Sequence, residues 1–422
     1  MTGRWRAAAG LLLAAAGVAA AGCESRNHEN PLDPQNGETG GRPNVLVPLA
    51  GDGSVELHWE TLGLRDLEGQ TLYRAADGGP RFEIATFSPG VSGWCDESAE
   101  NGRTYSYTLE WRFAGGAETT DLPQNRARPG KAWVWAADVT GGGLLSVTPD
   151  GQRIRYRIGG GRSVLDLAAD PGTGRVWGAD YDAGEILAYD PRTDTADLIP
   201  LRGVNTVSYD AASDLLWAGS FFDEVLVALR PDGTRLFTVD GIGLIEDVDA
   251  VPGAGAVAVS RGGQIHWVDA TGAKRLAGET DWPVSVAYDE LLEGAWVADR
   301  VTGEILFAEP DGTSPVPVAG DLQTPVDLGI DYEGRCWVAE RGGRVTRVAR
   351  DAGIDLRVAL DVSPEGVTVD PRSGEVWVCA PREGAIRLLD GSGVEIFRWE
   401  GSDWPKKVEA AWDPGEGPRC SN

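Results

Sequence analysis

Histidine is scarce in this sequence of 422 residues, which restricts the catalytic chemistry available to it. The three histidines are His28, His58 and His266, and only His266 lies between residue 131 and the C-terminus, where a repeat dominates. It falls within an expected strand and is predicted to be structural. The sequence contains no Gly-x-Ser-x-Gly elbow and no phosphate-binding loop. No catalytic constellation is evident, so no catalysis is expected.

Cysteine is also scarce, and its spacing excludes the usual zinc sites. The five cysteines are Cys23, Cys95, Cys336, Cys379 and Cys420, and no spacing among them is a zinc signature. Cys336 and Cys379 are offset by three residues in neighbouring repeats, roughly 10 Å at strand rise, which disfavours a disulfide between them. A bridge between Cys95 and Cys420, which would tie the N-terminal region to the repeats, is a hypothesis.

Basic residues are few relative to acidic ones, with 38 Lys and Arg against 65 Asp and Glu. A net charge of -27 repels phosphate-rich partners, so nucleic acid is not an expected ligand. The acidic residues are dispersed over the repeats rather than gathered into a tail, which favours a role in solubility. A cation or a basic peptide partner would also fit this charge.

The apolar run near the N-terminus, Ala7 to Ala21, is too short and too rich in alanine to span a membrane as a stable helix. It follows Arg4 and Arg6 and ends just before a cysteine. This order predicts a cleaved signal peptide over residues 1–22 and an extracytoplasmic protein.

The junction Ala20-Ala21-Gly22-Cys23 resembles the lipobox of bacterial lipoproteins. The resemblance implies that Cys23 carries the lipid, and multiple acyl chains give stable membrane anchoring. Ala20 stands where leucine is usual, so an ordinary secretory signal is the alternative. Glu24 does not match the aspartate of the inner-membrane retention signal, which favours the outer membrane, with a periplasmic or surface-exposed body. Residues 23–42 contain almost nothing that could enter a core and are predicted to be a flexible tether.

A repeat of about 40 residues runs from residue 131 to the C-terminus. Each copy has an aromatic or apolar residue, then small residues and often an acid, and successive copies start 39 to 42 residues apart. The copies are Trp135-Ala136-Ala137-Asp138, Trp177-Gly178-Ala179-Asp180, Trp217-Ala218-Gly219-Ser220, Val257-Ala258-Val259-Ser260, Trp296-Val297-Ala298-Asp299, Trp337-Val338-Ala339-Glu340 and Trp377-Val378-Cys379-Ala380. Alternating runs and Asp-Gly turns after each copy predict four short antiparallel strands per repeat.

Sheets of this kind cannot bury a core alone, so a ring of them, a seven-bladed β-propeller over residues 130–418, is expected. The first repeat lacks an innermost strand, whereas residues 408–413 form a spare one at the end of the chain. Pairing this last strand with the first repeat would close the ring and remove its open edge. The tryptophans of the repeat are expected to pack between blades, and a carbohydrate-stacking platform is the alternative.

The repeats resemble those of NHL-type and related seven-bladed propellers, in which strands and an Asp-Gly turn accompany a "V-A-D" phrase. The resemblance covers residues 131 to about 417. It implies an architecture but not a function, because this ring occurs in lyases, lactonases and many binding proteins.

Residues 43–129 show strand patterns at Ser54–Trp59, Gln70–Arg74, Phe82–Ala85 and Thr104–Leu109, which fit an immunoglobulin-like sandwich. The segment resembles a fibronectin type III module, with Trp59 as the core tryptophan and Tyr105 at the tyrosine corner. The fold class is therefore all-β, a fibronectin III sandwich plus a propeller. The resemblance implies a spacer, with a recognition role as the alternative.

The loops after each aromatic strand and before each innermost strand are expected to open on one face of the ring. Acids and aromatics gather in blades one to three, whereas arginines are added in the later blades. Such a mixed rim would bind a zwitterionic, peptide or sugar ligand, or would form salt bridges between blades. The candidate ligand residues are Asp138, Asp180, Tyr181, Phe222, Arg261, Trp282, Asp299, Arg300, Glu340, Arg341 and Trp404.

The sequence favours a lipid-anchored envelope protein whose ring is a binding or scaffold platform for proteins or glycans. The alternative is a metal-dependent hydrolase or lyase of the lactonase or streptogramin-lyase type. Lactonase-like propellers hold a divalent cation, and Glu246, Asn205 and Asp299 have suitable types for Ca²⁺, but no cofactor is predicted. A stalk without a ligand is a third reading. The sequence fixes neither the ligand nor the oligomeric state.

Overall fold

The computed structural model describes residues 46–59, 67–120, 125–130, 132–140, 142–311, 314–370, 373–402 and 404–412. The predicted signal peptide and tether, as well as Cys23 and Cys420, lie outside these residues. Apart from one 3₁₀ turn, η1 (Pro381–Glu383), the regular elements here are strands. In these ranges no helix has the length and hydropathy needed to cross a membrane.

The N-terminal β-domain consists of two sheets that share one hydrophobic core. One sheet has the order β1 (Val47–Ala50), β2 (Val55–His58), β5 (Gly93–Asp96). The other has the order β4 (Phe82–Phe87), β3 (Leu67–Ala76), β6 (Tyr105–Phe113), β7 (Gly116–Thr120), and β8 (Arg126–Ala127) also pairs with β6.

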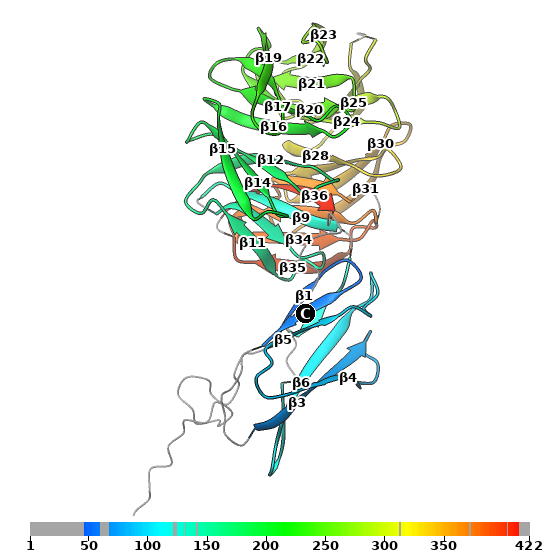
Figure 1. Cartoon of the computed structure of the whole chain (residues 1–422). Coiled ribbons are helices and arrows are strands. Elements are labelled where there is room, and N and C mark those ends of the chain that lie inside the picture. Colours follow the sequence, from blue (N-terminus) through cyan, green and yellow to red (C-terminus); the bar gives the residue numbers. More distant parts are fainter. Residues whose placement is uncertain are drawn as a thin grey trace, which may run out of the picture.

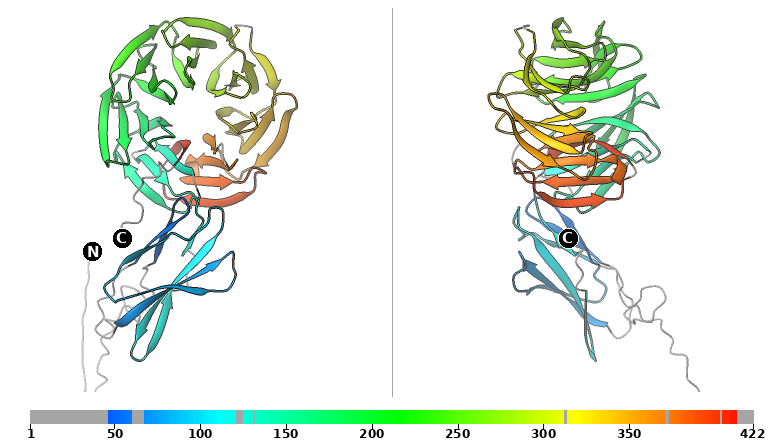
Figure 2. Two further views of the ribbon diagram at one scale, coloured as in Figure 1. Left: turned by 45° about the vertical axis from the view of Figure 1, so that its right-hand side comes forward. Right: turned by 180° about the vertical axis from the view of Figure 1, so that it is seen from behind.

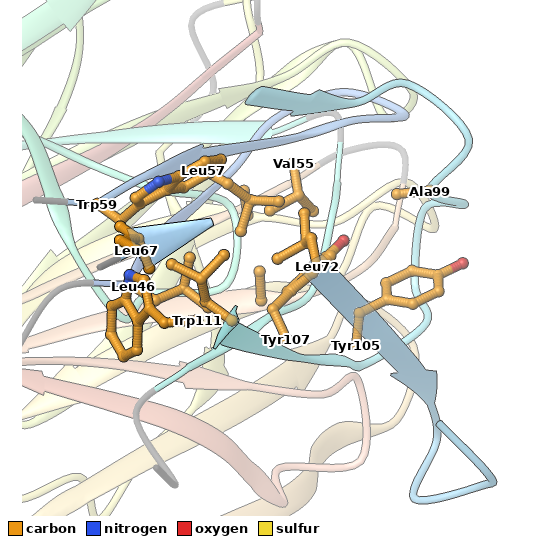
Figure 3. Packing of buried hydrophobic residues seen from close by; sticks show 13 residues of the cluster. Leu46, Val55, Leu57, Trp59, Leu67, Leu72, Ala99, Tyr105, Tyr107 and Trp111 are labelled. Atoms are coloured by element: carbon orange, nitrogen blue, oxygen red, sulfur yellow. The ribbon is translucent and has the colours of Figure 1, made fainter. Parts of the chain in front are cut away.

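The core of this domain holds the aromatic residues expected from the sequence (Figure 3). Trp59 is 4% exposed and donates from Nε1 to the carbonyl of Val91 at 2.7 Å. Tyr105 is buried, and its hydroxyl accepts a hydrogen bond from the backbone N–H of Glu100 at 2.9 Å. Both side chains therefore fix a loop to a sheet while burying apolar area.

The rest of the described chain forms seven four-stranded antiparallel sheets arranged as a ring, a β-propeller (Figures 1 and 2). Within each blade the strands follow one another from the axis outward. The strands of blades 1 to 4 are β36 (Pro405–Trp412), β9 (Ala132–Asp138), β10 (Gly143–Val147), β11 (Ile154–Ile158); β12 (Val164–Ala169), β13 (Val176–Asp180), β14 (Glu185–Asp190), β15 (Thr195–Pro200); β16 (Val204–Asp210), β17 (Leu215–Ser220), β18 (Val225–Leu229), β19 (Arg235–Asp240); and β20 (Ile245–Val251), β21 (Gly255–Ser260), β22 (Gln264–Asp269), β23 (Lys274–Glu279). Those of blades 5 to 7 are β24 (Pro283–Asp289), β25 (Gly294–Asp299), β26 (Glu304–Ala308), β27 (Val316–Ala319); β28 (Pro325–Ile330), β29 (Cys336–Glu340), β30 (Arg344–Ala349), β31 (Gly353–Ala359); and β32 (Gly366–Val369), β33 (Val376–Ala380), β34 (Ala385–Leu389), β35 (Glu395–Glu400).

The tryptophans of the repeat pack between blades, as predicted. All six are at most 1% exposed. Trp177 of blade 2, for example, stacks on Tyr209 of blade 3 with ring centres 4.7 Å apart. Because no face of these rings reaches solvent, they do not form a carbohydrate platform.

The ring closes through the last strand, as the phase of the repeat predicts. Strand β36 pairs antiparallel with β9, with Lys407 opposite Ala137 and Trp412 opposite Ala132. Its neighbours on either side are the innermost strands β32 and β12. The first blade is therefore built from both ends of the propeller segment, and its inner edge is not left open.

Replacing Gly366 by alanine is expected to lower the free energy of unfolding by about 1 to 3 kcal/mol, because a Cβ there overpacks the closing strand. The added atom would lie 2.6 Å from the Lys406 carbonyl oxygen and 2.6 Å from Cys379 Sγ. Urea unfolding measures the change. Gly160→Ala is the matched control, since its Cβ would meet nothing within 4 Å, and equal midpoints for the two variants would contradict the tight closure.

The described cysteines separate into two groups. Cys336 and Cys379 are buried and free, which confirms that they do not bridge. Cys95 is disulfide-bonded. Its partner lies outside the described residues, so the Cys95–Cys420 bridge stays a prediction.

Candidate functional site

One face of the ring, called here the upper face, carries both sets of loops expected to form a site. It is defined by the loops between the second and third strands of each blade and by those that lead into the innermost strands. Backbone hydrogen bonds join the two sets within a blade. They run from the N–H groups of Val139, Phe221, Arg261, Arg300 and Arg341 to the carbonyls of Trp404, Gly203, Leu244, Trp282 and Thr324, respectively.

Four of the candidate ligand residues do not face a ligand. Asp138, Asp180, Asp299 and Glu340 are at most 1% exposed. The Asp299 carboxylate accepts hydrogen bonds from the N–H groups of Trp282 and Val301, both at 2.8 Å. These acids at the strand ends therefore hold the turns of the upper face together, and the expectation that they line its surface is corrected.

The protonation behaviour of two of these acids agrees with this structural role. Burial alone would raise the pKa of Asp138 and of Asp299. The hydroxyls of Ser402 and Thr280, together with backbone N–H groups, more than offset burial and hold both pKa values below their usual range. Both carboxylates are therefore ionised and already satisfied by the protein.

A bulge in the innermost strands turns a second set of side chains toward the axis of the ring. Six of these strands shift register by one residue at the same place, and β32 starts just after it. A bulge leaves one residue unpaired and re-aims its side chain. The bulged residues are Leu165, Asn205, Glu246, Val284, Val326 and Lys406, and each lines a cavity of about 140 Å³ at the axis.

The floor of this axial cavity is a layer of charged side chains from alternate blades. Asp166, Asp247 and Asp327 each accept a hydrogen bond from a backbone N–H of the next blade, at 2.8 to 3.0 Å. Lys407 reaches Asp327 from blade 1, with Nζ 2.6 Å from Oδ1. The layer separates the axial cavity from a larger one of about 440 Å³ beneath it, and both are lined by Lys407.

Two ion pairs stand at the mouth of the axial cavity. Arg261 Nε contacts Glu246 Oε1, and Arg341 binds both oxygens of Glu365 at 2.6 Å. These pairs agree with the reading of the mixed rim as a set of salt bridges. Each basic residue is partly exposed, at 47% and 37% of its side chain, so the pairs add little stability by themselves.

Arg300 lies at the same mouth without such a partner. Its guanidinium makes no ion pair with a residue of the described ranges and lies over the ring of Trp282, 5.4 Å from the centroid. Burial lowers the pKa of Arg300, and the nearby charge of Arg341 lowers it further. Lys406 lines the same cavity and likewise has no ion-pair partner in the described part of the chain.

An aromatic arc, formed by Tyr181, Phe222, Phe221 and Trp282, runs along the upper face to this mouth. The rings of Tyr181 and Phe222 are 5.1 Å apart, and those of Phe222 and Phe221 are 6.1 Å apart. Arg261 bridges the last two members of the arc, since its guanidinium lies 4.7 Å from the Phe221 centroid and 5.4 Å from that of Trp282. Phe222 is 54% exposed, so the arc offers apolar area to a partner.

The remaining candidates are divided between the cavity and other parts of the upper face. Trp404 is 39% exposed and belongs to blade 1, beside Asp138. Glu246 and Asn205 both line the axial cavity, whereas Asp299 is held in its turn. Within the described residues no group of three or more His, Cys, Asp or Glu side chains is arranged to hold a metal ion.

The charged residues of the cavity floor are not among those predicted from the sequence. Asp166, Asp247 and Asp327 are 81 and 80 residues apart, so one recurs in every second repeat, and Lys407 follows 80 residues later. The recurrence of a charged residue at every second repeat was the sequence signal that could have revealed this layer.

Comparison by sequence gives no relative: no family model matches the chain, and no curated protein matches it. Comparison by structure finds many similar folds. A functionally unknown protein from Desulfotomaculum acetoxidans DSM 771 is 12% identical, with a TM-score of 0.56 over 66% of this chain and 99% of its own. Hydrazine synthase from Kuenenia stuttgartiensis (12% identity, TM-score 0.47, 54% of this chain and 76% of that one) and a nidogen/laminin complex (13%, 0.46, 66% and 98%) are more distant in fold. At these identities the similarity concerns the fold alone, and the fold is that of a β-propeller protein.

Proposed function

We propose that this chain is a lipid-anchored protein of the cell envelope whose ring binds a partner through its upper face. Cys23 would carry the lipid and residues 23–42 would form the tether. The N-terminal β-domain would act as a spacer of the fibronectin III type. The observation that carries the proposal is the conjunction, on one face, of an axial cavity and a partly exposed aromatic arc that ends at its mouth.

The contacts between the N-terminal β-domain and the ring support this reading, because they leave the upper face free. Arg128 pairs with Glu375 at 2.7 Å, and Arg153 donates to the carbonyl of Pro48 at 3.0 Å. Glu375 and Arg153 belong to loops between first and second or third and fourth strands, which lie on the face opposite to the upper one. The domain accordingly sits beside blades 1 and 7, beyond β35 and β11 (Figure 1).

No comparable observation favours the hydrolase or lyase alternative. Asp299, one of its three supposed ligands, has both carboxylate oxygens occupied by hydrogen bonds from the protein. A binding platform is the function that the described geometry supports best.

Replacing Cys23 by serine tests the anchor. We expect the wild-type chain to be labelled by radioactive palmitate. We also expect it to sediment with outer membranes, because the several acyl chains of a lipoprotein give stable attachment. The Cys23→Ser chain should carry no label and should appear in the soluble fraction. Equal membrane recovery of both chains would contradict lipid anchoring.

The binding role is tested by chemical cross-linking in cells with two matched variants. Phe222→Lys removes an exposed aromatic side chain from the arc, whereas Tyr332→Lys removes one, 58% exposed, from the opposite face. We expect cross-linked partners of the wild-type chain to be lost in Phe222→Lys and kept in Tyr332→Lys. Absence of partners, or equal loss in both variants, would count against the platform.

A further inference from the structure

The size of the axial cavity limits what can enter it. Its volume is about 140 Å³, whereas sites that enclose a whole small molecule typically measure about 300 to 1,000 Å³. A sugar ring or a nucleotide is therefore too large to be enclosed. A group of the size of one amino-acid side chain fits.

At the mouth of the cavity, basic side chains outnumber carboxylates. It carries the basic side chains of Arg261, Arg300, Arg341 and Lys406 but only two carboxylates, which are engaged by Arg261 and Arg341. A guanidinium that is partly withdrawn from water gains most from a carboxylate, which it can bind through two hydrogen bonds. Arg300 is such a group, and it makes no ion pair with a carboxylate in the described part of the chain.

The carboxylates at the floor of the cavity already have hydrogen-bond or ion-pair partners within the ring. Asp327 already binds Lys407, and Asp247 accepts hydrogen bonds from the Thr206 hydroxyl at 2.9 Å and from Val286 N–H at 3.0 Å. Asp166 accepts one from Val207 N–H at 2.8 Å. These carboxylates are thus already engaged by the ring itself, whereas Arg300 and Lys406 at the mouth have no ion-pair partner in the described residues.

We propose that the axial cavity receives the carboxylate of a polypeptide partner, bound by Arg300 and Lys406, while an apolar side chain of the same segment packs on the aromatic arc. The proposal rests on the proposed function, which it deepens by naming the partner's chemistry. The continuity of the arc with the cavity through Arg261 and Trp282 supports a segment that spans both. Aromatic and arginine side chains are also those that most often dominate the energy of protein interfaces.

Panning of a random heptapeptide display library on the purified chain lacking its signal peptide tests the proposal. We expect the enriched peptides to contain Asp or Glu close to an aromatic or aliphatic residue. Synthetic copies should lose about tenfold or more in affinity when the acid is replaced by its amide, because a charge-assisted hydrogen bond is lost. Titration calorimetry measures both affinities.

The variant Arg300→Gln should weaken the acidic peptide by a similar factor and leave the amide peptide almost unchanged, since the two changes remove the same interaction. Arg382→Gln removes one positive charge from the same face outside the cavity and should have little effect. Thermal unfolding of each variant checks that the ring is intact.

Three outcomes would overturn the inference. Enriched peptides without an acid, or with lysine in its place, would show that the cavity does not select a carboxylate, although the platform itself would stand. An equal loss of both peptides in Arg300→Gln would show that Arg300 acts only on the local structure. Failure to enrich any peptide would contradict the carboxylate site, and the cross-linking experiment would then decide separately on the platform.

Discussion

Replacing Lys407 by methionine is expected to lower the free energy of unfolding by about 3 to 5 kcal/mol, because it leaves buried carboxylates without their counter-charge. Lys407 is the basic member of the floor layer, and Asp327, Asp247 and Asp166 raise its pKa in spite of its burial. It reaches Asp327 across blade 7, where Gly366 presents no side chain. Guanidinium chloride unfolding at pH 7.5 measures the loss.

Two controls separate this electrostatic effect from simple damage to the closing strand. Lys406→Met changes the neighbouring residue of the same strand, which has no described ion pair, and should cost less than about 0.5 kcal/mol. The double variant Lys407→Met, Asp327→Asn should recover part of the stability, since it also removes one uncompensated charge. If Lys406→Met is as damaging as Lys407→Met, the proposed role of the ion pair is wrong.

The architecture of the ring was predictable because a period of about 40 residues leaves a signature in every repeat. The tryptophan column marked the second strand of a blade, and its phase showed that the innermost strand of the first blade had to come from the end of the chain. The pairing of β36 with β9 follows from that phase. Lengths of loops and strands varied too little to hide it.

The site was predictable only in part, because its geometry depends on backbone register. The sequence predicts that the acids at the ends of the tryptophan strands, such as Asp138 and Asp299, lie on an open face. Instead, the short side chain of an acid beside a turn accepts hydrogen bonds from the nearest backbone N–H groups. The bulge that turns Asn205 and Glu246 to the axis is a shift of one residue in hydrogen bonding. Residue types alone do not specify such a shift.

The second large effect concerns Glu409, which lies on the closing strand two residues after Lys407. It lines the larger cavity below the floor layer. Burial raises its pKa to about 8, Asp249 and Asp166 add to the rise, and Lys407 offsets only part of it. In the unfolded chain the glutamate has its ordinary pKa of 4.5. The folded ring therefore holds a proton on Glu409 that the unfolded chain releases.

The sign of the pH dependence follows from this difference. The contribution of Glu409 to the free energy of unfolding is fully present below pH 4.5, where the side chain is protonated in both states. Because its pKa is raised in the folded ring, this contribution is lost as the pH rises through about 8. Asp166 and Asp249, whose pKa values are raised to about 6 mainly by burial, act in the same direction between pH 4 and 6. Asp138 and Asp299 act in the opposite direction, because their pKa values are lowered. Their contribution to stability is present at neutral pH and is lost only as the pH falls below the usual pKa of aspartate.

The variant Glu409→Gln should therefore match the wild-type chain at pH 5 and exceed its free energy of unfolding at pH 8.5 by on the order of 2 kcal/mol. The gain is smaller than the full pKa difference would give, because the Glu409 side chain is only partly buried and solvent screening weakens the effect at such positions. Urea unfolding at pH 5, 7 and 8.5 measures it. Glu279→Gln, at an exposed position of β23, should show no such trend. A wild-type chain equally stable at pH 5 and 8.5, with no gain from Glu409→Gln, would show that this glutamate is ionised within the closed ring.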